Sequence, residues 1–115
     1  MVIYDIVIIY NMSTRSMIKF QCDDESVSVY KHWDGYPEVT IKELQTFLKW
    51  NGARNDDLPY TVANFCYWYK KGHEEHTGLG VISNPDQDWG QEYMYTVHLK
   101  NNRITEKNSS GEWNF

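Results

Sequence analysis

The groups best suited to bind or transform a ligand are concentrated in residues 30–38, which read YKHWDGYPE. This run combines three aromatic rings and an imidazole with carboxylates, a glycine and a proline. His32 and Asp34 are two residues apart, so an extended chain places them on the same side, where they could act as a general acid–base pair. The nearby serines lie in no nucleophile-elbow motif, so a small hydrolase is the least favoured function.

A second group of reactive residues is the sequence HEEH at 73–76. Zinc proteases place two histidines four residues apart on a helix, with a glutamate after the first one. Here the histidines are three residues apart and follow a glycine in a predicted loop. The glycines at 78 and 80 precede a predicted strand, whereas phosphate-binding loops open a helix. We therefore predict neither a metal nor a cofactor.

The chain is rich in flat side chains that suit ligand stacking, because aromatic residues make up 16% of it. With only three arginines present, an anion site must use some of Arg15, Arg54 and Arg103, or Lys31. The candidate ligand-binding residues come from the 30–38 run, the predicted second helix and the arginines: His32, Asp34, Tyr36, Arg54, Asn64, Trp68 and Arg103. The alternative is a purely structural corner, in which Trp33 lies in the core and Asp34 closes a turn.

The formal net charge of −5 limits the possible partners. A protein that grips polymeric DNA or RNA by its phosphates needs a basic surface, which this composition does not supply. A small anionic ligand held by one or two local cations is compatible with it. The acidic residues themselves suggest an alternative function, an inhibitor that binds a host protein through an acidic surface. They are Asp23, Asp24, Glu25, Asp56, Asp57, Glu74, Glu75, Asp86 and Asp88.

Two features predict a protein of the cytoplasm. Cys22 and Cys66 are far apart and lack metal-ligand spacing, which favours a reducing compartment. The apolar run at 2–10 contains Asp5 and is too short for a membrane span or the core of a signal peptide. We therefore expect no contact with a membrane.

The spacing of apolar residues predicts the secondary structure. Period-two alternation predicts strands at 2–10, 17–21, 27–31, 79–83, 92–100 and 103–107. Helical spacing predicts a first helix at 41–50, with Thr40 and Glu43 as a capping box and Gly52 as its stop. A second helix follows the N-cap candidates at 55–57, tolerates Pro59 in its first turn and ends near residue 71. The predicted buried stripes are Ile41, Leu44, Phe47 and Leu48 in the first helix and Val62, Phe65, Cys66 and Tyr69 in the second.

This order, βββ-αα-βββ, predicts an α+β fold in which a largely antiparallel sheet carries both helices on one face. The chain of 115 residues is long enough for one core, and we place a single domain at 1–107. Residues 108–115 are predicted to form a polar and aromatic C-terminal tail. The apolar first strand, and Trp113 and Phe115 in the tail, favour a homodimer.

The motif HWDGYPE at 32–38, with the aromatic and apolar residues at 44–51 and 63–68, resembles the signature of small uncharacterised proteins from phages, archaea and archaeal viruses. The resemblance covers about residues 27–99. The signature carries no activity, so it implies a genomic setting and no catalytic residues. By analogy with small phage proteins that inhibit host defence, we hypothesise a non-enzymatic, homodimeric protein that sequesters a nucleotide-type signal in an aromatic pocket.

Overall fold

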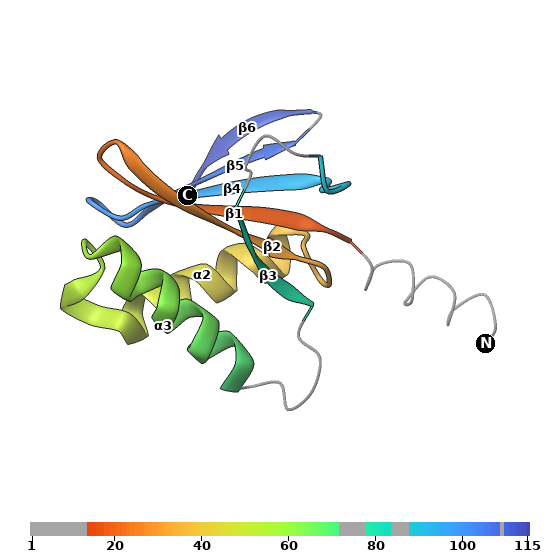
Figure 1. The fold of residues 1–115 in the computed structure, drawn as a ribbon. Helices are drawn as coiled ribbons and strands as arrows, with labels where there is room; N and C mark the ends of the chain where they lie inside the picture. The colour runs from red at the N-terminus through yellow and green to blue at the C-terminus, as the bar shows by residue number, and fades with distance from the viewer. Residues whose placement is uncertain (1–13, 72–77, 84–87, 109) are drawn as a thin grey trace.

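The computed structural model of the chain describes residues 14–71, 78–83, 88–108 and 110–115. The strand predicted at 2–10 and the HEEH sequence lie outside the described residues, as does part of the loop that precedes Trp89. All the other predicted strands and both predicted helices are present (Figure 1).

The fold is a six-stranded sheet with two helices packed on one of its faces (Figure 1). The strands are β1 (Ser16–Cys22), β2 (Glu25–Lys31), β3 (Leu79–Ile82), β4 (Tyr93–His98), β5 (Arg103–Asn108) and β6 (Gly111–Asn114). Between β2 and β3 the chain forms α2 (Pro37–Asn51), the short 3-10 helix η1 (Gly52–Arg54) and α3 (Leu58–Lys71). The predicted α+β class is confirmed.

The strand order across the sheet is β3-β2-β1-β4-β5-β6. Every neighbouring pair is antiparallel except β1 and β4, which run parallel in the two central positions. The sheet is therefore largely antiparallel, as predicted. One consequence of the parallel pair is that the start of β4 lies beside the start of β1, so that Tyr93 pairs with Ser16.

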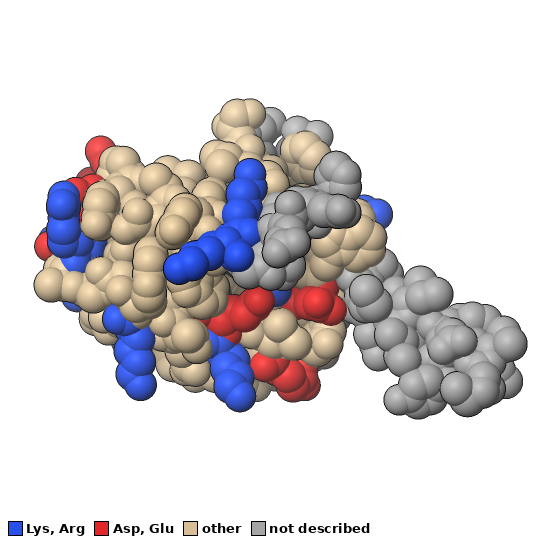
Figure 2. Space-filling view, turned by 90° about the horizontal axis from the view of Figure 1, so that it is seen from below, with Lys and Arg blue, Asp and Glu red and all other residues tan. Residues whose placement is uncertain are grey.

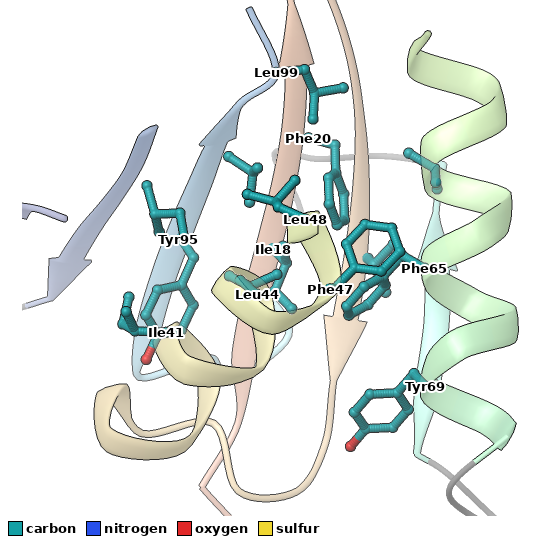
Figure 3. Close-up of a cluster of buried hydrophobic side chains, with 14 of the residues drawn as sticks. Ile18, Phe20, Ile41, Leu44, Phe47, Leu48, Phe65, Tyr69, Tyr95 and Leu99 are labelled. Carbon is teal, nitrogen blue, oxygen red and sulfur yellow. The ribbon is translucent and has the colours of Figure 1, made fainter. Parts of the chain in front are cut away.

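The hydrophobic core lies between the sheet and the helices, and Figure 3 shows its central side chains. Strand β1 contributes Ile18 and Phe20, which alternate with residues that face the other way. The predicted helical stripes are the buried ones, and Phe47 of α2 meets Phe65 of α3 with 5.2 Å between ring centroids. In the described part of the chain, neither helix is long and apolar enough to cross a membrane.

The first helix begins earlier than predicted, and its capping box is wrong. Helix α2 starts at Pro37, with Tyr36 as an N-cap that makes no side-chain capping bond. Pro37 suits the first helical position because its missing N–H has no partner there in any case. Thr40 and Glu43 therefore lie inside the helix, where they bind Lys31 instead of the helix end. The second helix follows its predicted cap, since Asp57 Oδ1 accepts the N–H of Tyr60 at 3.3 Å.

The C-terminal segment differs from the predicted tail. Residues Gly111–Asn114 form the edge strand β6, which pairs antiparallel with β5. The pairing continues beyond β6, because Phe115 and Ile104 exchange both of their backbone hydrogen bonds. The N–H of Ser110 donates to Asn108 Oδ1 at 2.7 Å, and the aromatic segment that follows runs back along the sheet edge.

Candidate functional site

The corner between β2 and α2 is built around Lys31, whose side chain is fully buried. Its ammonium group donates to the backbone oxygen of Asp34 at 2.9 Å, to Thr40 Oγ1 at 3.1 Å and to Glu43 Oε1 at 2.5 Å. The same group lies 5.7 Å from the centroid of the Tyr69 ring. A buried ammonium needs this many partners because an unpaired buried charge is very costly.

Lys31 is therefore committed to holding the corner to α2. Its three donors match three acceptors of the protein, which leaves none to bind an outside anion. Ser16 pairs with Lys31 across the strands, and its hydroxyl is the buried polar side-chain atom that has no hydrogen-bond partner in the described part of the chain. Because Lys31 is paired with Glu43, it is not a free base that could activate Ser16.

Asp34, Gly35 and Tyr36 shape the corner through their backbones. Asp34 takes the left-handed conformation, with φ of 51°, which aspartate adopts more readily than most other residues. Gly35 is required by close packing, because a Cβ on it would lie 2.8 Å from Ser16 Cβ. Its carbonyl oxygen also accepts the hydroxyl of Tyr95 at 2.7 Å.

Strand alternation sends the neighbours of Lys31 to the opposite, outer face of the sheet, away from the helices. There the hydroxyl of Tyr30 is hydrogen-bonded to His32 Nδ1 at 2.8 Å. Burial raises the pKa of the Tyr30 hydroxyl, and the positive charge of Arg15 acts in the other direction. The predicted acid–base pair of His32 with Asp34 is therefore not the contact that this imidazole makes. Its Nδ1 is hydrogen-bonded to Tyr30 instead.

Four rings form a continuous aromatic patch at this end of the sheet, made of Tyr30, His32, Trp33 and Trp89. Centroid distances are 5.8 Å from Tyr30 to His32, 5.7 Å from Tyr30 to Trp89 and 4.5 Å from His32 to Trp33. Trp33, which was predicted in the core, is 40% exposed, and Trp89 is 38% exposed. Arg15 lies beside them, with Nη1 donating to the backbone oxygen of Trp89 at 3.4 Å.

The patch continues across the outer face towards a cavity. Tyr30, Met17, Met94 and Lys107 are successive partners on β2, β1, β4 and β5, so they form a row across four strands. Three strand spacings span roughly 14 Å. At the far end of the row lies a cavity of about 550 Å³, lined by Gln91, Glu92, Tyr93, Met94, Lys107, Asn108 and Ser110. Met17, in the middle of this row, is only 1% exposed, so the row between the patch and the cavity is covered by other parts of the chain.

The other candidate residues lie away from the patch. Asn64 donates to Asn51 Oδ1 at 2.7 Å, and Trp68 packs on Phe47 with 5.7 Å between centroids, so both of them join the helices to each other. Arg54 lies over the Tyr60 ring at 4.1 Å.

Arg103 is placed on a different element again. Its Nη2 donates to Asn114 Oδ1 of β6 at 3.2 Å. Arg54 directly precedes Asn55, and Arg103 directly follows Asn102. These neighbours meet at the far end of the sheet, where Asn55 Nδ2 donates to Asn102 Oδ1 at 3.1 Å. The structure therefore places His32 in the patch and Asp34 and Tyr36 in the adjoining corner, and separates the remaining four candidates from them.

Five of the nine residues predicted to form an acidic surface gather at that far end, and Glu74, Glu75 and Asp86 lie outside the described residues. A cavity of about 430 Å³ is lined by the β1–β2 turn and the start of α3, with Cys22, Asp23, Asp24, Glu25, Asp56, Asp57, Leu58 and Pro59 around it. On the helical face, by contrast, basic side chains lie among acidic ones (Figure 2). No group of three or more metal-ligating side chains with a suitable arrangement occurs within the described residues.

The predicted ligand-binding residues did not include Trp89 or Tyr30, and Arg15 was named only as one possible cation of an anion site. The alternation through 27–32 already placed Tyr30 and His32 on one side, which was the available signal. Trp89 carried no such signal, because it stands in a loop whose approach to Tyr30 depends on the parallel pairing of β4 with β1.

The described chain is thus a two-layer α+β domain whose outer sheet face carries an exposed aromatic patch beside an arginine. Comparison with protein-family models, curated proteins and solved structures finds no match to the chain.

Proposed function

We propose that the protein is a non-enzymatic binding protein that sequesters a small nucleotide-type ligand on the aromatic patch. The observation that carries this proposal is the unbroken contact of four rings, two of them indoles with more than a third of their surface exposed, beside the guanidinium of Arg15. Large exposed aromatic surfaces at one place are characteristic of binding sites.

The rings supply the stacking half of such a site. Stacking of a base on an aromatic side chain contributes about 1–3 kcal/mol per base and tolerates any base, because every base has a π-face. Trp33 and Trp89 are the exposed ends of the ring series. Trp33 packs against His32, and Trp89 packs against Tyr30. The hydrogen bond between Tyr30 and His32 restricts both rings, which lowers the entropy that a ligand must remove on binding.

A cation beside the rings supplies the phosphate-binding half. Arg15 is exposed and its Nη1 donates to the backbone oxygen of Trp89, whereas the buried Met17 separates Lys107 from the patch. One local cation suits a small anion with a ring at one end. The net charge of −5 opposes a polymer, whose many phosphates need a broad basic surface.

The contacts of His32 and Asp34 support a protein that binds its ligand without catalysing a reaction. The imidazole of His32 is held by Tyr30, and Asp34 serves the corner through its backbone oxygen. A sequestering role in the cytoplasm fits the resemblance of the HWDGYPE motif to phage and archaeal virus proteins. The proposal is therefore an anti-defence protein that holds a nucleotide signal without cleaving it.

Thermal-shift and calorimetric titration with a panel of cyclic and ADP-ribose-type nucleotides tests the proposal. We expect one class of nucleotide to raise the melting temperature and to be recovered intact from the complex. Trp89→Ala should lower the affinity at least tenfold, which corresponds to loss of one stacking contact. Trp50→Ala is the matched control, because Trp50 is 50% exposed on α2 in the helical layer. No shift with any nucleotide, or equal effects of the two variants, contradicts the proposal.

A second candidate function is inhibition of a host protein through the acidic end of the sheet. The specific observation is that five carboxylates from the β1–β2 turn and the start of α3 surround the 430 Å³ cavity. Within the described residues, the ion pairs that offset them are Lys100–Asp23 and Arg54–Asp57. A pull-down from host lysate with the parent protein and with a variant carrying Asp23→Asn, Asp24→Asn and Glu25→Gln tests this. A stoichiometric protein partner that is lost with the variant favours this function over nucleotide binding.

A further inference from the structure

Among the described strands, β6 is the last at one edge of the sheet, and its outer side pairs with none of them. All four of its residues are exposed, and the aromatic side chains of Trp113 and Phe115 are 43% and 49% exposed. Exposed edge strands readily pair with another chain, and proteins usually protect them with lysine, proline or a bulge. The segment from Gly111 to Phe115 contains neither lysine nor proline.

The hydrogen-bond pattern of β5 and β6 decides which groups are free at this edge. Phe115 and Ile104 exchange both backbone bonds, at 2.7 Å and 3.2 Å. Hydrogen-bonded pairs alternate along an antiparallel ladder, so Trp113 also directs its N–H and C=O towards β5. Glu112 and Asn114 therefore direct theirs away from the sheet, towards an incoming strand.

We propose that β6 pairs antiparallel with β6 of a second copy of this chain, about a two-fold axis at Trp113. In this register Glu112 of each copy lies opposite Asn114 of the other, and the two residues exchange their outward-facing backbone bonds. The two sheets then form one continuous sheet, with both outer faces on the same side. Such strand addition satisfies the backbone groups that the edge leaves open.

Charge complementarity selects this register. Arg103 donates to Asn114 Oδ1 at 3.2 Å, so the guanidinium lies where Glu112 of the second copy arrives. The symmetry repeats this contact, which gives two pairs of opposite charge. A register centred on Glu112 would place two glutamates directly opposite each other, which is destabilising, and one centred on Asn114 would move Glu112 away from Arg103.

The aromatic residues fit the same register. Trp113 faces Trp113 of the second copy as a non-hydrogen-bonded pair, where side chains approach most closely. Phe115 lies opposite Gly111, whose lack of a side chain leaves room for the ring. The contact is short, so the interface is smaller than a standard one, and we expect a dimer with a dissociation constant in the micromolar range or above.

A cysteine cross-link tests the register. Cysteines at a non-hydrogen-bonded antiparallel pair, with Cα atoms about 4.5 Å apart, meet the geometry of a disulfide. Under mild oxidation Trp113→Cys should give a covalent dimer with twice the 13.7 kDa mass of the chain. The parent protein, which keeps Cys22 and Cys66, is the control. Cross-linking through Glu112→Cys without cross-linking through Trp113→Cys would overturn the register.

A charge exchange tests the contact without cysteine chemistry. In sedimentation measurements Glu112→Lys and Arg103→Glu should each weaken the dimer about tenfold, and the double variant should regain parental affinity. Within one chain the residue opposite Glu112 is Lys107 and not Arg103. Rescue of Glu112→Lys by Arg103→Glu would therefore report a contact between the two copies. Val81→Lys on the opposite edge strand β3 should leave association unchanged, because Val81 is 64% exposed there. A parent protein that is monomeric at about 1 mM, or a dimer that Val81→Lys disrupts, overturns the proposal.

Discussion

The ammonium group of Lys31 lies 2.5 Å from Glu43 Oε1, although the lysine side chain is fully buried and the glutamate is 28% exposed. This pair joins the end of β2 to the second turn of α2 and so fixes the corner that precedes the helix. The outer-face position of Tyr30 and His32 depends on the same corner, because Lys31 stands between them in the strand. A structural ion pair therefore supports the aromatic patch from the other side of the sheet.

Removing Glu43 should be more damaging than removing Lys31. Glu43→Ala leaves a buried ammonium without its anion, and we expect it to lower the free energy of unfolding by about 3 kcal/mol. Lys31→Met replaces the charge with a side chain of similar length, and the expected loss is below about 1.5 kcal/mol. Urea denaturation measures both values. Glu38→Ala, an exposed position on the same helix, is the control and should change stability by less than about 0.5 kcal/mol. Equal losses for Glu43→Ala and Lys31→Met would show that the pair is not the anchor.

Gly35 and Gly80 should respond differently to a methyl group. A Cβ at Gly35 would approach Ser16 Cβ and the Arg15 carbonyl carbon to 2.8–2.9 Å, whereas a Cβ at Gly80 meets no atom within 4 Å. We expect Gly35→Ala to cost about 1–3 kcal/mol, because overpacking forces the backbone of the corner to shift. Gly80→Ala should be neutral or slightly stabilising in thermal denaturation. A tolerated Gly35→Ala would mean that the corner can open away from β1.

Alkaline pH should unfold the protein through its buried tyrosines. Burial raises the pKa of Tyr69 and Tyr95 above their ordinary value of 10.0. Above pH 10 these hydroxyls ionise in the unfolded chain while they stay protonated in the folded one, so the unfolded state binds fewer protons. Stability is therefore complete below pH 10 and falls above it, by roughly 1.4 kcal/mol per pH unit for each tyrosine. Denaturation midpoints between pH 8 and 11 measure this slope.

Tyr95→Phe provides the matching variant for the alkaline effect. It removes one ionising group and should reduce the slope above pH 10 by roughly 1.4 kcal/mol per pH unit. Near neutral pH it should cost about 1–2 kcal/mol, since the Gly35 carbonyl oxygen loses its buried donor at 2.7 Å. A slope that is unchanged in Tyr95→Phe would exclude this tyrosine as a source of the alkaline sensitivity.

Arg15 should determine how nucleotide affinity depends on salt. Arg15→Gln removes the guanidinium beside Trp89, and we expect about tenfold weaker binding together with a smaller decrease of affinity on raising the salt concentration. Arg54→Gln is the control, because Arg54 is exposed and lies near the acidic end of the sheet. Calorimetry at two salt concentrations separates the variants. Equal affinity of parent and Arg15→Gln would remove Arg15 from the site.

Local patterns were enough to predict most of the secondary structure. Alternating apolar residues predicted β1, β2, β4 and β5, and the spacing of Leu44 with Phe47 predicted the buried side of α2. These signals succeed because side-chain direction repeats every two residues in a strand and every 3.6 in a helix. The capping box failed because Thr40 and Glu43 satisfy a buried ammonium, a demand that arises only when β2 meets the helix.

The sequence by itself therefore determined the α+β class, the order of the elements from β1 to β5 and the side of β2 that carries Tyr30 and His32. The tertiary structure alone decided the strand order, the burial of Lys31 and the exposure of Trp33. It also decided the meeting of Trp89 with Tyr30 across 59 positions of the chain. The physical reason is that periodicity records only the direction of each side chain. Which surfaces meet depends on pairings between distant strands, such as the parallel contact of β1 with β4.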